Sequence, residues 1–349
     1  MNRSSGVWRR YRKRIVLALA AALLLAIVLL PSPSHSSAVL LYDVLNGCPD
    51  EHRGAVVRAD SFLIIGHRGA AGYEVENTLP SMDTALAHGA NAVEIDLSMT
   101  ADGEIVLWHD WLPDDAVATA RASGTEPDVL CKPLTPESES KFFRPVHLLT
   151  LDELRTHYGY SLMDSDRRLD ARIPTLDEFL AWSAGKSDLR CVVLDIKLPE
   201  EHAALAVGMF RRIEARLAAA APAYDIIYLT PSTEILRRVD PILPRGNISY
   251  DHTPTAGLVL DPCGQSSVDT AVAFGNNVAS MMSPKATTVA PWTTTWRIME
   301  CEVAKAKRGG VGRVIVATLN EKEKLECLVR LGVDGIITDY PDRLRSIVR

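Results

Sequence analysis

The sequence predicts a single α/β domain built around a parallel β-barrel. Two observations point to this fold: short, apolar, β-rich runs recur along the chain, and helical stretches with apolar residues at three- and four-residue spacing lie between them. With 349 residues, 47% of them hydrophobic, the chain can bury a large core, and α/β barrels of this length are commonly one domain. The predicted strands are 62–65, 92–97, 191–196, 226–229, 258–260, 278–281, 314–318 and 335–338.

The clearest helical patterns fall between these strands. They are 79–88, 202–219 and 322–331. A further short strand over 105–108 follows the turn Asp102-Gly103, which predicts a hairpin ending at His109. Residues from about 112 to 172 are rich in proline and polar side chains and too long for a plain loop, so we expect an insertion over the carboxyl-terminal face of the barrel. Its Phe142-Phe143 pair either packs onto the barrel or lines an entrance.

Residues 1–38 predict a signal peptide or a membrane anchor. Six basic residues and no acidic one lie in the first fourteen positions, and the sixteen residues from Ile15 to Leu30 are all Ala, Ile, Leu or Val. Secretory segments have roughly 7–15 apolar residues and membrane spans about 20, so both interpretations stay open. Residues 39–60 form a linker to a domain over 61–349, which we expect to be exported: periplasmic, extracellular, or anchored to the membrane by the N-terminal helix.

Charge and cysteine content argue against a nucleic-acid-binding protein and against a zinc site. Beyond the N-terminal segment the chain holds 32 basic and 44 acidic residues, so it lacks the basic footprint of a nucleic-acid-binding protein. Six cysteines in an exported chain permit disulfides, but no Cys-x-x-Cys spacing suggests zinc. The apolar surroundings of Cys191 and Cys327 predict buried thiols. The remaining candidate bridges are Cys48 with Cys131, or Cys263 with Cys301.

Two acidic residues within one predicted strand suggest a cation site. Glu94 and Asp96 are two positions apart, so their side chains point to the same side, which is inward in a barrel. Two buried carboxylates repel each other, and a divalent cation removes that cost; oxygen ligands favour Mg²⁺ or Ca²⁺. A pair of solvated acids on an edge strand is the alternative, but the apolar residues around them indicate a covered strand.

A second strand end adds an acid and a base to this site. Asp195 follows the apolar run 192–194 and would lie at the same rim, which makes it the natural third ligand. Lys197, two residues on, would face the same way. The two could instead form a structural ion pair, which the spacing does not exclude.

Two histidines also end predicted strands, where the active-site groups of such barrels collect. His67 is followed by Arg68, and His109 by Asp110. Cleavage of a phosphodiester needs one group to take a proton from the nucleophile and another to protonate the leaving oxygen, and imidazoles do both near neutral pH. Arg68 offers a bidentate fork for phosphate oxygens.

Taken in order, these motifs resemble the glycerophosphodiester phosphodiesterase family. The matching motifs are His-Arg-Gly at 67–69, Glu-Asn-Thr at 76–78, Gly-Ala-x-x-Val-Glu-x-Asp at 89–96, Thr-x-Asp-Gly at 100–103, His-Asp at 109–110, Ile-Pro-Thr-Leu-Asp-Glu at 173–178, Leu-Asp-Ile-Lys at 194–197 and Gly-Val-Asp-Gly-Ile-Ile-Thr-Asp-Tyr-Pro at 332–341. They span nearly all of the chain after about residue 61. Together they are highly specific, although each alone is weak.

The resemblance implies a TIM (β/α)₈ barrel that hydrolyses a glycerophosphodiester to glycerol 3-phosphate and an alcohol with one divalent cation, Mg²⁺ or Ca²⁺. A lysophospholipid is the other candidate substrate. The implied site residues are catalytic His67 and His109, metal-binding Glu94, Asp96 and Asp195, substrate-binding Arg68 and Lys197, and supporting Glu76 and Asn77. An uncleaved N-terminal segment would add membrane contact.

Two departures from the family pattern bear on the substrate. Asp195 stands where the family usually has Glu, so the shorter side chain needs a bridging water or a closer backbone. The late Trp-Thr-x-Asn motif is here the segment 317–320, Ala-Thr-Leu-Asn, so an aromatic wall is missing unless Trp292 or Trp296 replaces it. Asp at the third position also occurs in sphingomyelinase D-like phospholipases, which are one alternative; a non-catalytic, membrane-tethered binding protein is another.

Overall fold

The computed structural model describes residues 61–230, 232–243, 248–252, 267–282 and 296–348. The predicted N-terminal hydrophobic helix and linker lie outside these residues. Among the helices that the structure describes, none combines the length and the apolar character that crossing a membrane requires.

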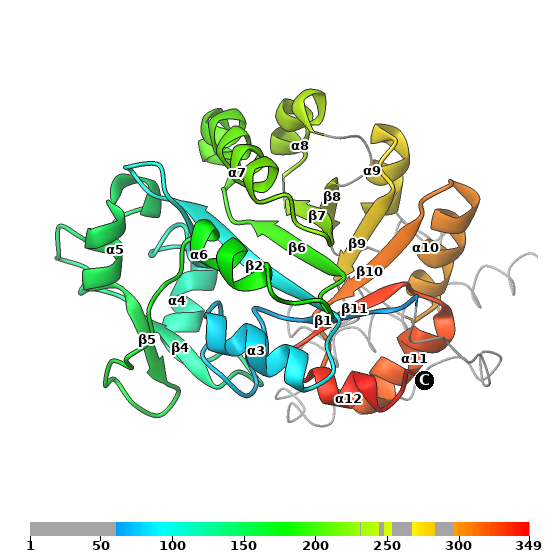
Figure 1. The fold of residues 1–349 in the computed structure, drawn as a ribbon, viewed down its shortest axis with the longest axis horizontal. Coiled ribbons are helices and arrows are strands. Elements are labelled where there is room, and N and C mark those ends of the chain that lie inside the picture. The colour runs from blue at the N-terminus through cyan, green and yellow to red at the C-terminus, as the bar shows by residue number, and fades with distance from the viewer. Residues whose placement is uncertain (1–60, 231, 244–247, 253–266, 283–295, 349) are drawn as a thin grey trace, which may run out of the picture. The chain divides into compact units, whose positions relative to one another are not determined.

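Eight parallel strands of the described chain form a ring of pairings, with helices outside it (Figure 1). The first strand, β1, pairs with both β2 and β11, and the order from β2 onward is β6, β7, β8, β9, β10, β11. The strands are β1 (Leu63–Gly66), β2 (Ala92–Met99), β6 (Cys191–Ile196), β7 (Asp225–Thr230), β8 (Ile248–His252), β9 (Val278–Met282), β10 (Arg313–Ala317) and β11 (Gly335–Thr338). This architecture is consistent with the predicted TIM barrel.

One predicted strand does not correspond to a described barrel strand. The barrel position between β7 and β9 is held by β8, whereas the predicted strand over 258–260 lies outside the described residues. The sequence of β8, Ile-Ser-Tyr-Asp-His, lacks the continuous apolar run on which the prediction relied. Ser249 is nevertheless buried, and its Oγ accepts a hydrogen bond from Ser280 N of β9 at 2.7 Å. The buried hydroxyl therefore has a polar partner.

Helices cover the outside of the strands. They are α3 (Leu79–Ala87), α6 (Leu176–Ser183), α7 (Ala206–Ala220), α8 (Thr233–Val239), α9 (Ser267–Phe274), α10 (Trp296–Arg308), α11 (Lys322–Leu331) and α12 (Pro341–Arg345), with 3₁₀ turns η3 (Glu200–Leu205) and η4 (Asp240–Ile242). The three helices predicted from periodicity are confirmed as α3, η3 with α7, and α11. Local signals set their ends: Thr175 and Glu178 form a capping box at the start of α6, and α11 ends at Gly332, whose φ is 81°.

Apolar side chains fill the barrel interior at every second position of the strands. This inner cluster is Leu63, Ile65, Ala92, Cys191, Val193, Ile227, Leu229, Val278, Ile315, Ala317 and Ile337. Because strand side chains alternate, Glu94 and Asp96 lie on the same inward side as Ala92, and Asp195 on the same side as Val193. The barrel is therefore apolar inside and becomes acidic towards the carboxyl ends of β2 and β6.

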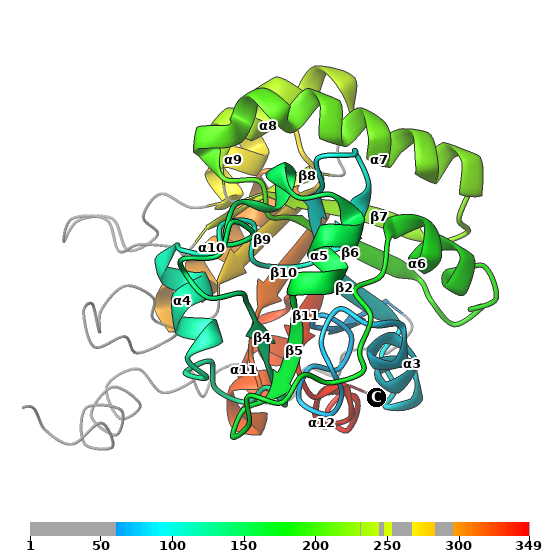
Figure 2. The ribbon, with the colours of Figure 1, turned by 90° about the vertical axis from the view of Figure 1, so that its left-hand side faces the viewer.

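The segment predicted as an insertion contains its own small elements and core. These are α4 (Ala116–Ala122), β4 (Cys131–Leu134), η2 (Val146–Leu148), α5 (Leu151–His157) and β5 (Gly159–Leu162). It follows β3 (Ile105–Leu107), which pairs antiparallel with β2 as the hairpin prediction required. In Figure 2 these elements lie in front of the barrel strands. Ala101, just beyond β2, donates from its backbone N to Leu149 O at 2.8 Å, and Phe142 stacks on His157 within the insertion.

The cysteines depart from the predictions in two places. Cys191 is a buried free thiol, as expected. Cys131 is also free and buried, so the bridge proposed between Cys48 and Cys131 is wrong. Cys301 and Cys327 are both disulfide-bonded, so the prediction of a free thiol at Cys327 is wrong as well. An apolar helical pattern shows that a cysteine is covered, but it carries no information about which residue lies opposite.

Candidate active site

The predicted site residues come together at the carboxyl ends of neighbouring strands. His67 and Arg68 follow β1, Glu94 and Asp96 belong to β2, and His109 lies just after β3. Asp195 and Lys197 lie at the end of β6, whose residues pair in register with β2, so that Asp96 is opposite Asp195. Side chains far apart in the sequence thus meet at one barrel mouth.

Each imidazole is held by a carboxylate at the same ring nitrogen. His67 Nδ1 lies 2.6 Å from Asp339 Oδ1, and His109 Nδ1 lies 2.6 Å from Asp110 Oδ1. A carboxylate can only accept, so Nδ1 of each ring carries the hydrogen, and Nε2 is left for chemistry. Asp110 is adjacent to His109 in the sequence. Asp339 was not among the predicted site residues, although it directly follows β11 in the motif at 332–341.

Asn320 fixes the carboxylate that holds His67. Its Nδ2 donates to Asp339 Oδ2 at 2.6 Å, while its Oδ1 accepts from Asp339 N and from Thr338 Oγ1, both at 3.0 Å. These contacts determine which end of the amide carries the oxygen. The asparagine of the altered motif 317–320 therefore orients the partner of His67, a role that the sequence alone did not reveal.

Three carboxylates are arranged as a cation site would require. Oxygen atoms of Glu94, Asp96 and Asp195 all lie within 4.8 Å of one another. Glu94 Oε2 accepts from Arg68 N at 2.8 Å, but its Oε1 is buried and has no hydrogen-bond partner among the described residues. Burial, reinforced by Asp96 and Asp195, raises the pKa of Glu94 well above its usual value. A dication would satisfy the free oxygen and remove this repulsion, so the donor set fits Mg²⁺ or Ca²⁺. The shorter side chain of Asp195 reaches the group.

Asp96 is held by an ion pair and by hydrogen bonds. Lys197 Nζ lies 2.9 Å from Asp96 Oδ1 and 2.6 Å from Asp195 Oδ2. Asn77 Nδ2 donates to Asp96 Oδ2 at 2.7 Å, and Asn77 Oδ1 accepts from Asp96 N at 3.1 Å. Burial is the largest influence on Asp96 and raises its pKa, but Lys197 and Arg68 outweigh burial and hold the pKa well below its usual value. Asp96 therefore stays ionised.

Arg68 lies in a strained backbone conformation above this group. Its φ is 48°, in the left-handed region, and Asn77 shares that region with a φ of 53°. The two loops hold each other, because Asn77 N donates to Arg68 O at 2.9 Å. Gly69 (φ 90°) is required for packing as well, since a Cβ there would lie 2.6 Å from the backbone of Ser81. The guanidinium of Arg68 bonds Glu76 at 2.6 Å and lies 3.0 Å from Asp96.

The insertion contributes two charged residues that the sequence analysis missed. Arg121 of α4 is buried and donates to Asp110 Oδ1 at 3.0 Å and to Glu76. Glu126, in the following loop, forms ion pairs with both Arg121 and Arg68. Only an insertion folded back over the barrel creates these contacts, so no spacing in the sequence signals them. Arg121 therefore links the insertion to His109 through Asp110.

Burial, together with neighbouring cations, keeps the ring of His109 neutral. Burial, followed by Lys197, Arg121 and Arg68, lowers the pKa of His109 well below its usual value. The carboxylate of Asp110 is itself buried, and burial raises its pKa. His109 therefore enters the site as an uncharged imidazole near neutral pH, with Nε2 free to accept a proton.

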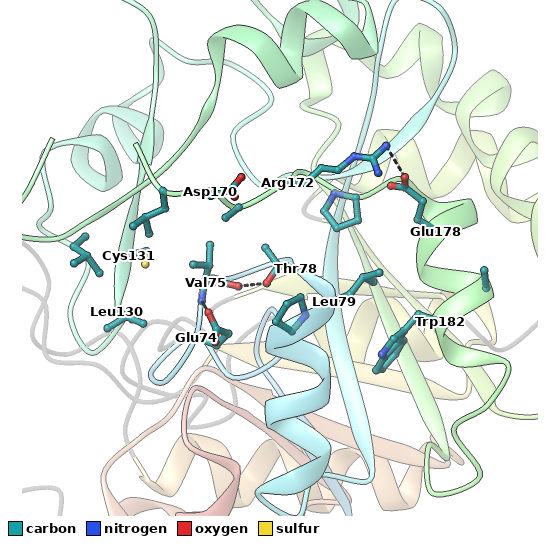
Figure 3. Close-up of a pocket in the computed structure, with 16 residues that line it drawn as sticks. Glu74, Val75, Thr78, Leu79, Leu130, Cys131, Asp170, Arg172, Glu178 and Trp182 are labelled. Carbon is teal, nitrogen blue, oxygen red and sulfur yellow. Dashed lines mark hydrogen bonds and ion pairs between the residues drawn. The ribbon is translucent and has the colours of Figure 1, made fainter. Parts of the chain in front are cut away.

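A separate pocket lies on the outer side of the loop that carries Glu76 and Asn77. It has a volume of about 850 Å³ and lies between the start of α3, the insertion and α6, as Figure 3 shows. Its lining includes apolar residues such as Val75, Leu79 and Trp182, and the ion pair of Arg172 with Glu178 (2.8 Å). None of the predicted catalytic or metal-binding residues lines this pocket.

The aromatic wall expected from Trp292 or Trp296 is not provided by the described residues. Trp296 is only 5% exposed and packs in the core beneath α10, and Trp292 lies outside the described residues.

With this geometry established, comparison with known proteins decides the family. The model of the glycerophosphoryl diester phosphodiesterase family matches residues 67–343. The chain belongs to this family. The match begins at His67 and runs past Asp339, so it includes every residue of the site described above.

Relatives of the family resemble this chain over most of their length. A glycerophosphodiester phosphodiesterase of Caldanaerobacter subterraneus is 26% identical over 291 residues, covering 82% of this chain and 98% of the relative. A solved structure of a putative glycerophosphoryl diester phosphodiesterase from Silicibacter pomeroyi has a TM-score of 0.59 at 26% identity, covering 85% of this chain and 95% of that one. An Oleispira antarctica phosphodiesterase, solved with the product sn-glycerol-3-phosphate, has a TM-score of 0.58 at 20% identity, over 81% and 95% of the two chains, and supports the fold.

Proposed function

We propose that this family member hydrolyses glycerophosphodiesters to glycerol 3-phosphate and an alcohol. The observation that carries the proposal is the paired arrangement of His67 and His109, each held at Nδ1 by a carboxylate and placed beside the acidic group of Glu94, Asp96 and Asp195. Phosphodiester cleavage needs a proton acceptor and a proton donor on the two sides of the phosphorus, and two imidazoles with free Nε2 atoms supply both.

The three carboxylates are proposed to hold one divalent cation, Mg²⁺ or Ca²⁺. When bound, such an ion polarises a phosphoryl oxygen and offsets the charge that develops on it. Arg68 and Lys197 are the proposed phosphate contacts, because both place cationic groups against this acidic mouth. Glu76 and Asn77 keep Arg68 and Asp96 in position through the hydrogen bonds given above. Neutral His109 is available to accept the proton, which leaves His67 to protonate the leaving oxygen.

Turnover of a defined substrate tests this proposal. Purified protein, treated with a chelator and then supplied with Mg²⁺ or Ca²⁺, is expected to release glycerol 3-phosphate from glycerophosphocholine only after the cation is restored. His67→Ala and His109→Ala are expected to lose turnover by about 10²–10⁴-fold, the usual contribution of one acid–base group. His88→Gln is the matched control, because His88 is not one of the site residues and its side chain, 38% exposed, lies beside Asp342. Full turnover in chelator, or in both alanine variants, would exclude the mechanism.

A lysophospholipid is a second candidate substrate. The apolar pocket of about 850 Å³ does not contain the catalytic residues, but its lining residue Val75 directly precedes Glu76 of the site. It therefore offers a surface of the kind that an acyl chain extending from the site needs. Comparing kcat/KM for glycerophosphocholine with that for lysophosphatidylcholine separates the two. Release of choline from sphingomyelin would instead favour the sphingomyelinase D-like alternative.

We also propose that the protein is exported, remaining anchored if its N-terminal segment is not cleaved. The basic, then apolar start of the sequence supports this, as do the disulfide-bonded Cys301 and Cys327, since disulfides persist in oxidising compartments. Fractionation of the native host, with the mature N-terminus sequenced, would show the location; a soluble cytoplasmic protein with an intact first residue contradicts it.

A further inference from the structure

Glu126 reaches into the candidate active site from the insertion. Its Oε1 lies 3.1 Å from Arg68 Nη1, and its Oε2 forms a short ion pair with Arg121 Nη1. The side chain of Glu126 is 22% exposed, whereas those of Arg68 and Arg121 are 5% and 4% exposed. Glu126 is therefore the most exposed member of this cluster, and the two arginines lie beneath it.

The position of Glu126 is one that suits a phosphate. Burial is the largest influence on its carboxyl group, yet Arg68, Arg121, His67 and His109 together lower its pKa to about 2. The carboxylate of Glu126 thus interacts electrostatically with the same groups that the proposed reaction needs around a phosphodiester. Guanidinium groups bind carboxylates and phosphates through the same paired N–H geometry, so one anion can take the place of the other.

The charge balance opposes simultaneous occupation by Glu126 and a substrate. Arg68 already contacts Glu76 and Asp96, and Arg121 already contacts Glu76 and Asp110. With Glu126 present as well, an incoming phosphodiester meets a carboxylate where it needs a cation. Withdrawal of Glu126 leaves neither arginine unpaired, because the buried carboxylates remain. The loop can therefore give up this contact without leaving an uncompensated charge.

We propose that Glu126 occupies the phosphate position in the substrate-free protein, and that its displacement presents Arg121 together with Arg68 to the phosphate of the substrate. Arg121 becomes a phosphate-binding residue contributed by the insertion, and Glu126 an internal competitor that raises KM. This inference rests on the proposed function, since it names a further binding group for that reaction.

Calorimetric binding of sn-glycerol 3-phosphate and of inorganic phosphate tests the proposal, with and without the cation that supports activity. Glu126→Gln is expected to bind both anions about tenfold more tightly than the wild type, the effect of removing one partly screened like charge, and to lower KM by a similar factor. Glu126→Asp, which keeps the charge but shortens the side chain, is expected to lie between the two. Glu137→Gln is the matched control: Glu137 is exposed, belongs to the insertion and makes no ion pair or side-chain hydrogen bond among the described residues.

The outcomes separate this inference from the proposed function. Unchanged or weaker anion binding by Glu126→Gln, with native melting behaviour, overturns the role of Glu126. An equal gain in Glu137→Gln overturns it as well, because such a gain would reveal only a long-range effect of charge. A purely structural ion pair predicts lower stability without tighter binding. Wild-type turnover of glycerophosphocholine is measured in parallel; its absence counts against the proposed function, while the binding data still report on Glu126.

Discussion

Replacing Asp339 by asparagine should impair His67 while leaving the size of the side chain at position 339 unchanged. Asn320 cannot turn to suit the new side chain, because its Oδ1 already accepts from Asp339 N and Thr338 Oγ1. Its Nδ2 must keep donating, so the new amide turns its oxygen towards Asn320 and its NH₂ towards His67 Nδ1. Nδ1 then becomes the acceptor, and the ring hydrogen moves to Nε2. His67 loses the carboxylate that stabilises its protonated form.

The size of the effect follows from the bond that is replaced. A hydrogen bond to a charged group contributes about 1.5–3 kcal/mol, and each 1.4 kcal/mol of activation free energy is about a factor of ten, so kcat should fall roughly 10- to 100-fold. KM should change little, because the phosphate contacts are untouched. The alternative orientation of the new amide would oppose two NH₂ groups at Asn320 and lower stability instead, which thermal melting detects.

Initial rates of glycerol 3-phosphate release from glycerophosphocholine, measured with a coupled dehydrogenase, give kcat and KM. Asp342→Asn is the control, since this exposed carboxylate lies three residues further on and, within the part of the chain that the structure describes, its polar contacts are to Tyr73 Oη (2.9 Å) and His88 (3.8 Å). The reasoning is refuted if Asp339→Asn keeps kcat within about twofold of the wild type while melting normally, because a wrong tautomer could not do so.

Three further predictions concern the cation, pH and disulfides. In chelator, Glu94→Gln should have a higher melting temperature than the wild type, because it removes a carboxylate whose pKa is raised by burial. Added cation should no longer raise the melting temperature of this variant. A cation-dependent rise in the variant would contradict the proposed cation site. The pKa of His109 is lowered in the folded protein, so as the pH falls the unfolded chain is protonated at this residue first. The free energy of unfolding of the cation-loaded protein should therefore decrease below about pH 6.5, by at most about 1.4 kcal/mol per pH unit for one proton. Urea titrations should show a smaller decrease in His109→Gln, and equal pH slopes in the two proteins would argue against this assignment. Reduction of the bonded Cys301 and Cys327 should cost about 2–5 kcal/mol, measured as urea midpoints with and without reductant.

The sequence predicted those parts of the site that local rules position. Glu94 and Asp96 share a face because strand side chains alternate. His67 follows β1 and Asp195 lies near the end of β6, and the carboxyl ends of these parallel strands meet. The hairpin of β2 and β3 brings His109 back to the same place. The same rule would have found Asp339, which follows β11. Each of these statements needs only the residue's place within its own strand.

Other features depend on contacts between segments, which no local pattern carries. Arg121 and Glu126 act through the way the insertion folds back. Asn320 acts through three hydrogen bonds to Thr338 and Asp339, at the end of the next strand. The strand β8 escaped prediction because it buries Ser249, which is paired by Ser280 rather than by apolar packing. The bonded state of Cys327 likewise depends on which cysteine lies opposite.

The contact between His67 and Asp339 joins residues 272 positions apart, and the strands that precede them close the ring. During synthesis, a nascent chain therefore carries one completed imidazole–carboxylate pair, His109 with Asp110, long before the other exists. Of the barrel strands described, β11 is the last to be synthesised, so a chain truncated before it cannot hold an assembled site. Appearance of activity would report complete folding more directly than any spectroscopic signal of helix content.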